Sequence, residues 1–284
     1  MRLLGGVFGR SVRSRASDWG TRGGPQRVYL FAHETLRITA TEQLGPALLA
    51  SFRERLHAWA DRYRHDGWPS GTPLYLLRGY PSMLEAERDV ARLVVCATDQ
   101  QRHDRMLDIS GGDAAAIGEI RAAQDLILQQ QDPDLLSMAR LAIQHGRLSE
   151  RNANIPTNLP AVWARLGHIS RAESLARSIT DPGRQAWALA GLAQATAATG
   201  DLDRAETTAH AITHPYQQAR ALADLAQATA ATGDLGRARR LTTAAETTAH
   251  AITHPYQQAQ ALAGLAQATA ATGDLDRAET TAHA

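Results

Sequence analysis

The last third of this chain repeats one segment almost unchanged, and that repetition constrains the fold more than any other feature. Residues 212–235 read ITHPYQQARALADLAQATAATGDL, and residues 252–275 match them at all but two positions. A third copy begins at Ile179. The two differing pairs are Arg220/Gln260 and Asp224/Gly264. Tandem copies of this length fold as units that stack on their neighbours, so the sequence predicts an extended array that offers a binding surface.

Each copy is predicted to form two antiparallel helices. Leucine and alanine recur at spacings of three and four through ALAGLAQATAA and again after Thr-Gly-Asp, which is the period of an amphipathic helix. Gly200 can adopt the left-handed conformation that closes the first helix, and Asp201 can cap the second. The second helix is expected to end near His214, because Pro215 disfavours helical backbone in the residue before it.

The spacing of the turn glycines supports this unit. Gly167, Gly200 and Gly233 are 33 residues apart, whereas Gly273 follows after 40. The seven additional residues lie in the second helix of the third unit and amount to two helical turns. We therefore expect them to lengthen that helix and to leave its packing face in place.

These units resemble tetratricopeptide repeats, which are helix-turn-helix units of about 34 residues. The resemblance rests on residues that recur in the later copies: Leu189, Leu192, Gly200, Ala205 and Pro215. The chain departs from that family because Ala or Thr mostly replaces the large aromatic residues, the period is 33, and the proline comes early. The resemblance covers about residues 150–284 and implies an α-solenoid whose first helices line a groove.

The resemblance also implies which positions face that groove. By register they are Trp187, Gln194, Arg220, Gln227, Gln260 and Gln267. We expect a protein partner to bind there, although the glutamines can also be read as solvated helix positions. The chain ends in a second helix with no polar capping helix after it, so the end of the array is an alternative contact site through which copies would self-associate.

The first half shows no repeat, but its pattern is helical. Gly45-Pro46 is predicted to open a helix, with proline in the first turn. Its apolar residues recur at spacings of three and four and are expected to form one buried face: Leu49, Phe52, Leu56, Trp59 and Tyr63. Ser82 and Glu85 are predicted to form a capping box. A short strand is expected at residues 28–31.

A second resemblance covers most of residues 5–150. VYLFAHETLRITATEQLG, FRERLHAWADRYRHDGWPSGTPLYLLRGYPSML and CATDQQRHDRMLDISGGDAAAIGEIRAAQDLI are similar to the segment that follows the nucleotide-binding module in actinobacterial STAND-type (NACHT-like) signalling ATPases. The resemblance implies a winged-helix remnant, then a helical linker, then repeats. The ATPase module of that family has no counterpart in this sequence, so the chain is similar to a C-terminal piece or a shortened relative.

Composition excludes several activities. All 30 basic residues are Arg, so the chain has no Walker A lysine and no lysine for Schiff-base catalysis. The formal net charge of +1 does not point to nucleic acid or an acidic membrane as partner. Cys96 is the single cysteine and lies in an apolar run, which favours a buried, reduced thiol. No apolar run reaches the length of a membrane span, and no signal peptide is recognised, so we expect a cytoplasmic protein.

Motifs that could carry metal or catalytic chemistry are incomplete. His33-Glu34 begins like the zinc metalloprotease motif, but Arg37 stands where the second histidine is required. The glycine-rich residues 108–113 are interpreted as a loop and a helix cap. The arginines of the first 27 residues are interpreted as a solvated or disordered arm, because no aromatic interleaving or recognised nucleic-acid-binding fold accompanies them. We expect no catalytic residues, cofactor or metal.

Histidines recur in pairs four residues apart near the end of each second helix. The pairs are His210/His214 and His250/His254. Such a pair can bind a metal on one helix face, but no carboxylate or cysteine lies beside it at ligand spacing. A histidine near a helix C-terminus also interacts favourably with the helix dipole. We therefore expect no metal site at these residues.

The predicted organisation has three parts. Residues 1–40 form a basic arm with a winged-helix remnant, residues 41–148 a helical linker module, and residues 149–284 the repeat array. The repeat units are expected near 155–179, 180–212, 213–252 and 253–284. The predicted fold is all-α, ending in a tetratricopeptide-like α-solenoid.

The predicted function is a non-enzymatic interaction or sensor segment of a STAND-type signalling system. Its partners would be proteins, including an ATPase module encoded separately. The alternative is a DNA-associated regulator that uses the winged-helix remnant and the basic arm. Salt-dependent DNA binding by residues 1–40 would favour that alternative.

Overall fold

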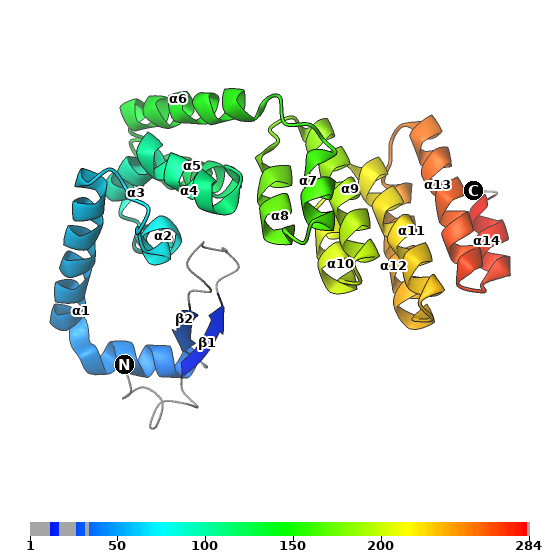
Figure 1. Ribbon diagram of the computed structural model, residues 1–284, viewed down its shortest axis with the longest axis horizontal. Helices are drawn as coiled ribbons and strands as arrows, with labels where there is room; N and C mark the ends of the chain where they lie inside the picture. The colour runs from blue at the N-terminus through cyan, green and yellow to red at the C-terminus, as the bar shows by residue number, and fades with distance from the viewer. Residues whose placement is uncertain (1–11, 17–26, 32–33, 283–284) are drawn as a thin grey trace. The chain divides into compact units, whose positions relative to one another are not determined.

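The computed structural model of the chain describes residues 12–16, 27–31 and 34–282 (Figure 1). The predicted all-α class is confirmed, with one added two-stranded hairpin. The chain divides into two compact units. The first consists of Met1–Ser110 with Ala115–Gln144, and the second of Gly111–Ala114 with His145–Ala284. The second unit contains the repeats.

The first unit begins with the hairpin. Strand β1 (Val12–Ala16) pairs antiparallel with β2 (Arg27–Phe31). The strand expected at residues 28–31 is therefore confirmed. Five residues of the expected arm form strand β1, and their backbone is paired with β2 rather than disordered.

Helix α1 (Glu34–His65) runs through the domain boundary expected at residue 40. Its direction changes inside the helix, as Figure 1 shows, at Gly45, whose φ of 69° and ψ of 163° are not helical. A positive φ of this kind is readily adopted by glycine. Pro46 follows in the first turn of the second segment, where proline is tolerated. The prediction that Gly45-Pro46 opens a helix therefore holds for this second segment.

The predicted buried face of α1 is wrong. The buried residues of this segment are His57 and Ala60, whereas Phe52 is 41% exposed. His57, on a polar side of α1, makes a contact with Tyr80 of the following helical segment: its Nδ1 lies 2.9 Å from the Tyr80 hydroxyl. Because that contact sets the rotation of α1, its large apolar residues lie beside the core rather than inside it.

A π-helical turn at Tyr75–Gly79 leads directly into α2 (Tyr80–Glu87). The predicted capping box is therefore wrong. Ser82 lies inside the helix, and its hydroxyl donates to the carbonyl of Arg78 at 3.2 Å. The remaining helices of this region are α3 (Val90–Ala97), α4 (Gln100–Ser110), α5 (Ala114–Leu128) and α6 (Leu135–Asn152).

The core of the first unit encloses a charged pair among its leucines and isoleucines. The side chain of Arg102 is fully buried and forms a bidentate ion pair with Glu119. The same guanidinium lies over the ring of Trp68, with 5.9 Å between Cζ and the ring centroid. Cys96 is also buried, as predicted, and burial raises the pKa of its thiol to about 11.

The second unit is built from successive helix pairs, seen from α7 to α14 in Figure 1. The first helices of the pairs are α7 (Leu159–Arg165), α9 (Pro182–Ala198), α11 (Pro215–Ala231) and α13 (Pro255–Ala271). The second helices are α8 (Ile169–Ser178), α10 (Leu202–His210), α12 (Leu235–His250) and α14 (Leu275–Ala282).

The turn inside the pairs confirms the predicted chemistry. Gly200 has a φ of 88°, and the carboxylate of Asp201 accepts a hydrogen bond from the backbone of Arg204 at 3.1 Å. The same cap recurs at the start of α12 and α14. Helix α12 has 16 residues against nine in α10, so the seven added residues lengthen this helix as predicted.

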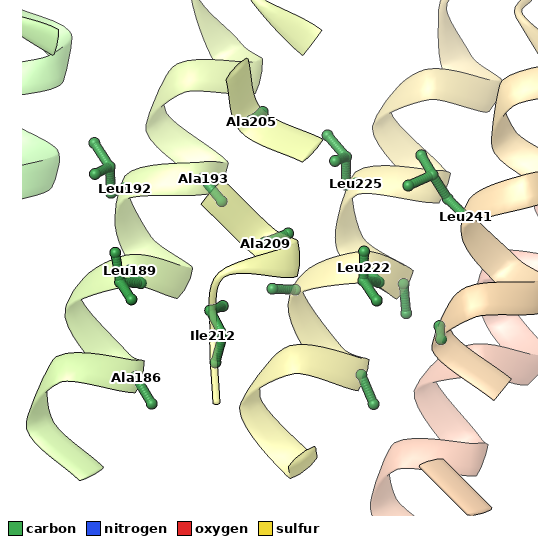
Figure 2. Close-up of a cluster of buried hydrophobic side chains, with 14 of the residues drawn as sticks. Ala186, Leu189, Leu192, Ala193, Ala205, Ala209, Ile212, Leu222, Leu225 and Leu241 are labelled. Atoms are coloured by element: carbon green, nitrogen blue, oxygen red, sulfur yellow. The ribbon is translucent and has the colours of Figure 1, made fainter. Parts of the chain in front are cut away.

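The core of the second unit consists mainly of leucine and alanine, with isoleucine at the helix ends (Figure 2). Leu189, Leu192 and Leu222 fill the space between helices, and Ala205 and Ala209 let the second helix approach closely. Dense packing of small and large side chains stabilises each pair on its neighbour. The leucines that begin α12 and α14 are instead exposed.

Polar side chains link each pair to the one before it. An ion-pair series joins successive second helices: Glu173–Arg204, Glu206–Arg237 and Glu246–Arg277. A glutamine in the first turn of a first helix donates to carbonyls at the end of the preceding second helix, as Gln218 does to His210 at 2.9 Å. The repetition of both contacts follows from the repetition of the sequence.

Candidate functional site

The predicted groove residues lie on one row of helices. Helices α9, α11 and α13 pack directly on one another, whereas the second helices approach one another less closely. Closer spacing on one side of a stack curves it toward that side, so the first helices form the inner row of the second unit. Small residues on these helices permit the close spacing. We call the surface that carries the six predicted residues the first-helix face.

The structure brings two predicted residues of this face together. Trp187 on α9 is 53% exposed. The guanidinium of Arg220 on α11 lies over its ring, with 6.0 Å between Cζ and the ring centroid. An arginine over an indole face is held by the ring quadrupole and contributes about 0.5–1 kcal/mol when exposed. The pair forms a flat, cationic surface that bridges two repeats.

A second contact joins α11 to the following first helix, α13. The hydroxyl of Tyr216 on α11 donates to Oε1 of Gln260 on α13 at 3.0 Å. The other three predicted residues, Gln194, Gln227 and Gln267, make no hydrogen bond within the described part of the chain. Their amides therefore remain available to a ligand on this face.

Asp224 belongs to the same face, although the motif register did not identify it. It lies one turn after Arg220 on α11, and its equivalents in α9 and α13 are Gly191 and Gly264. Partial burial raises the pKa of its carboxyl, and the charge of Arg220 opposes this shift. The signal was present in the sequence, since both differences between the near-identical copies fall at these two positions.

The paired histidines do not share a helix face. His210 ends α10, whereas His214 has extended backbone before α11. The i, i+4 argument for a metal pair therefore does not apply, because the helix stops between the two residues. The expectation that no carboxylate lies beside the pair is wrong, since Oε1 of Glu206 lies 3.9 Å from Nε2 of His210. Across residues 34–282, no three potential metal ligands come together. His33 lies outside the described residues.

The first-helix face offers a cation, one carboxyl, amides and an aromatic ring, which are groups suited to binding. None of the described helices is long and apolar enough to cross a membrane. Comparison with family models, with curated proteins and with solved structures found no match.

Proposed function

We propose that this chain is a non-enzymatic protein-interaction module that binds a peptide segment of its partner on the first-helix face. The observation that carries the proposal is the location of the two differences between the near-identical copies. Arg220 and Asp224 are surface residues one helical turn apart on this face. The core, the caps and the turn are identical in the two copies. The copies therefore keep one fold and differ in surface chemistry.

The chemistry of the face favours an extended, mixed-polarity peptide. The Trp187–Arg220 pair provides a flat surface for an aromatic or carboxylate side chain. Asp224 provides a carboxyl for a cationic one. The free amides of Gln194, Gln227 and Gln267 can donate to and accept from a peptide backbone.

We further propose that the module belongs to a STAND-type signalling system. The support is the order of its parts, a helical unit followed by stacked helix pairs, together with the sequence resemblance. Such a module would bind a partner or pack on an ATPase. Sequencing the DNA upstream tests this proposal. A P-loop ATPase there, fused or separate, is expected, and its absence would count against the STAND assignment.

The binding proposal is tested with the full chain and a displayed library of random peptides. Selected peptides are then titrated by calorimetry against the wild-type chain and a Gln227→Arg/Gln267→Arg variant. Two added cations block the centre of the face, so we expect affinity to fall about tenfold or more.

A matched variant adds two cations elsewhere on the array. Thr207→Arg/Thr247→Arg changes exposed residues of α10 and α12, and its affinity for the selected peptides should equal that of the wild type. Peptides that bind the Gln227→Arg/Gln267→Arg variant as tightly as the wild type would refute the first-helix face as the site.

A further inference from the structure

A second surface, on the first unit, has the properties of a docking site and is independent of the first-helix face. The second segment of α1 carries apolar side chains at helical spacing that the core does not cover: Leu48, Phe52, Leu56 and Trp59. Phe52 is 41% exposed, and Leu56 and Trp59 are half-buried. Exposed apolar residues that form a continuous stripe mark an interaction site more often than scattered ones do.

The stripe borders an open depression of the surface. A surface hollow of about 730 Å³ is lined by Phe52, Arg55, Leu56, Ala58, Trp59 and Arg62. Its aromatic wall, Trp59, is contacted by a second ring. The ring of Tyr75 stacks on Trp59 with 6.4 Å between centroids and 17° between planes. Because these rings support each other, the hollow presents a preformed apolar site for an inserted side chain.

The π-helical turn positions this aromatic wall. Tyr75 begins the turn, and its ring lies against Gly79, where an added Cβ would come within 2.6 Å of the ring. Trp59 also meets Tyr63 edge to face, at 6.0 Å between centroids. Helical segments of the π type occur frequently at functional sites.

Two arginines flank the hollow without a carboxylate partner. Arg55 lies over the ring of Phe52, 5.8 Å from its centroid, and neither Arg55 nor Arg62 forms an ion pair among the described residues. The other arginines of this segment differ. Arg53 pairs with Glu87, and Arg64 lies 3.5 Å from Asp61. Arg55 and Arg62 therefore add positive charge at the edge of the hollow.

We propose that this face of α1 binds an acidic amphipathic helix of a protein partner. Large apolar side chains of that helix, spaced at i, i+3/i+4 and i+7, would enter the hollow between Phe52 and Trp59. Carboxylates on its flank would pair with Arg55 and Arg62, since arginine binds carboxylate in bidentate geometry. The docked helix would cover the apolar stripe and also supply carboxylate partners for Arg55 and Arg62.

The test uses two synthetic peptides of about 18 residues, long enough to form a helix when bound. Both carry leucine at positions 4, 7, 8 and 11, a spacing that follows the helical period. One carries flanking glutamates, and the other carries lysines at the same positions. Binding to the full chain is measured by fluorescence anisotropy. We expect the acidic peptide to bind at least about tenfold more tightly than the basic one, with the difference reduced by salt.

The deciding variant is Arg55→Glu/Arg62→Glu. Charge reversal should weaken the acidic peptide about tenfold and make the basic peptide the tighter ligand. Arg121→Glu/Arg140→Glu makes the same charge change on exposed residues of α5 and α6, and it should leave the preference unchanged. If circular dichroism shows that the double variant is unfolded, the single variants Arg55→Gln and Arg62→Gln decide, with about threefold weakening of the acidic peptide expected for each.

Other outcomes would overturn the proposal. Equal affinity for the two peptides, or unchanged affinity in a folded variant, would remove the charge argument. Vesicles of phosphatidylserine that bind through the same two arginines would assign the face to a membrane surface. Self-association in light scattering that is lost in Arg55→Glu/Arg62→Glu would assign it to a second copy of the chain.

Discussion

At the scale of single residues, the segment Gly111–Ala114 shows how a loop becomes part of the repeat unit. Asp113 is almost fully buried and accepts hydrogen bonds from Arg151 and from Nδ2 of Asn152, the latter at 2.9 Å. The hydroxyl of Ser178 accepts from the backbone of Asp113 at 2.6 Å. Gly112 lies so close to α8 that a Cβ would come within 2.6 Å of the carbonyl of Ser174.

We therefore predict that Gly112→Ala destabilises the second unit by about 1–3 kcal/mol, the usual cost of overpacking. Two of the three nearest atoms belong to the backbone of Ser174 and cannot rotate away. Gly146→Ala is the control, because a Cβ on that helical glycine meets nothing within 4 Å. It should stabilise by about 0.5–1 kcal/mol through helix propensity. Urea denaturation measures both, and equal midpoints for Gly112→Ala and the wild type would contradict the prediction.

At the scale of helices, α11 and α13 have nearly the same sequence but different surroundings. Tyr216 on α11 is half-buried and donates to Gln260 of the neighbouring first helix. Its equivalent on α13, Tyr256, is 67% exposed and makes no hydrogen bond among the described residues. We therefore expect the same side chain in two nearly identical helices to contribute differently to stability, because its neighbours differ.

Tyr216→Phe should cost about 0.5–1.5 kcal/mol, the usual contribution of a hydrogen bond, whereas Tyr256→Phe should be neutral. The comparison cancels differences in helix propensity, since the local sequences match. Thermal or urea unfolding of the two variants measures the difference. Equal losses would mean that the hydrogen bond between α11 and α13 contributes nothing in solution.

The positions of the helices could be predicted from the sequence better than the tertiary contacts that each helix makes. The helix pairs, the Gly200 turn and the longer α12 follow from local chemistry and spacing, so they could be predicted. The rotation of α1 could not, because periodicity identifies the apolar stripe but not the neighbour that meets it. The contact of His57 with Tyr80 joins residues 23 positions apart, and no local pattern signals it.

The candidate face was predictable only in part, because its positions follow from repeat spacing but its contacts do not. Repeat register identified Trp187 and Arg220 as surface residues of successive helices, and the structure places them in contact. The contact of Tyr216 with Gln260 has no counterpart one unit earlier, where Gly183 stands at the position of Tyr216, and the family register did not identify it. Asp224 was missed because the register came from a family pattern rather than from comparing the two copies.

At the scale of the whole molecule, the second unit is a chain of nearest-neighbour contacts. Helix α11 packs on α9, α12 and α13, and Leu222 lies in the shared core. In such arrays stability is approximately the sum of unit and interface contributions. A destabilising substitution in one helix pair should therefore destabilise the neighbouring pairs and leave distant parts of the chain unchanged.

Leu222→Ala tests this expectation. We predict a loss of about 2–5 kcal/mol, as for other buried leucines. Amide hydrogen exchange should accelerate in α9 and in α11 to α13, and residues 50–110 should exchange as in the wild type. Leu77→Ala, a buried leucine of the first unit, should show the reverse distribution. Acceleration throughout the chain in either variant would mean that both units open as one.

The buried thiol of Cys96 has a practical consequence. It is the single cysteine of the chain and lies in the first unit, where burial raises its pKa to about 11. Thiol reagents attack the thiolate, so the native chain should be inert to them. Each modified molecule therefore records one opening that exposes Cys96, without an engineered label. The rate of that reaction therefore measures how often Cys96 becomes exposed in the first unit. The repeats contribute no signal, because they contain no cysteine.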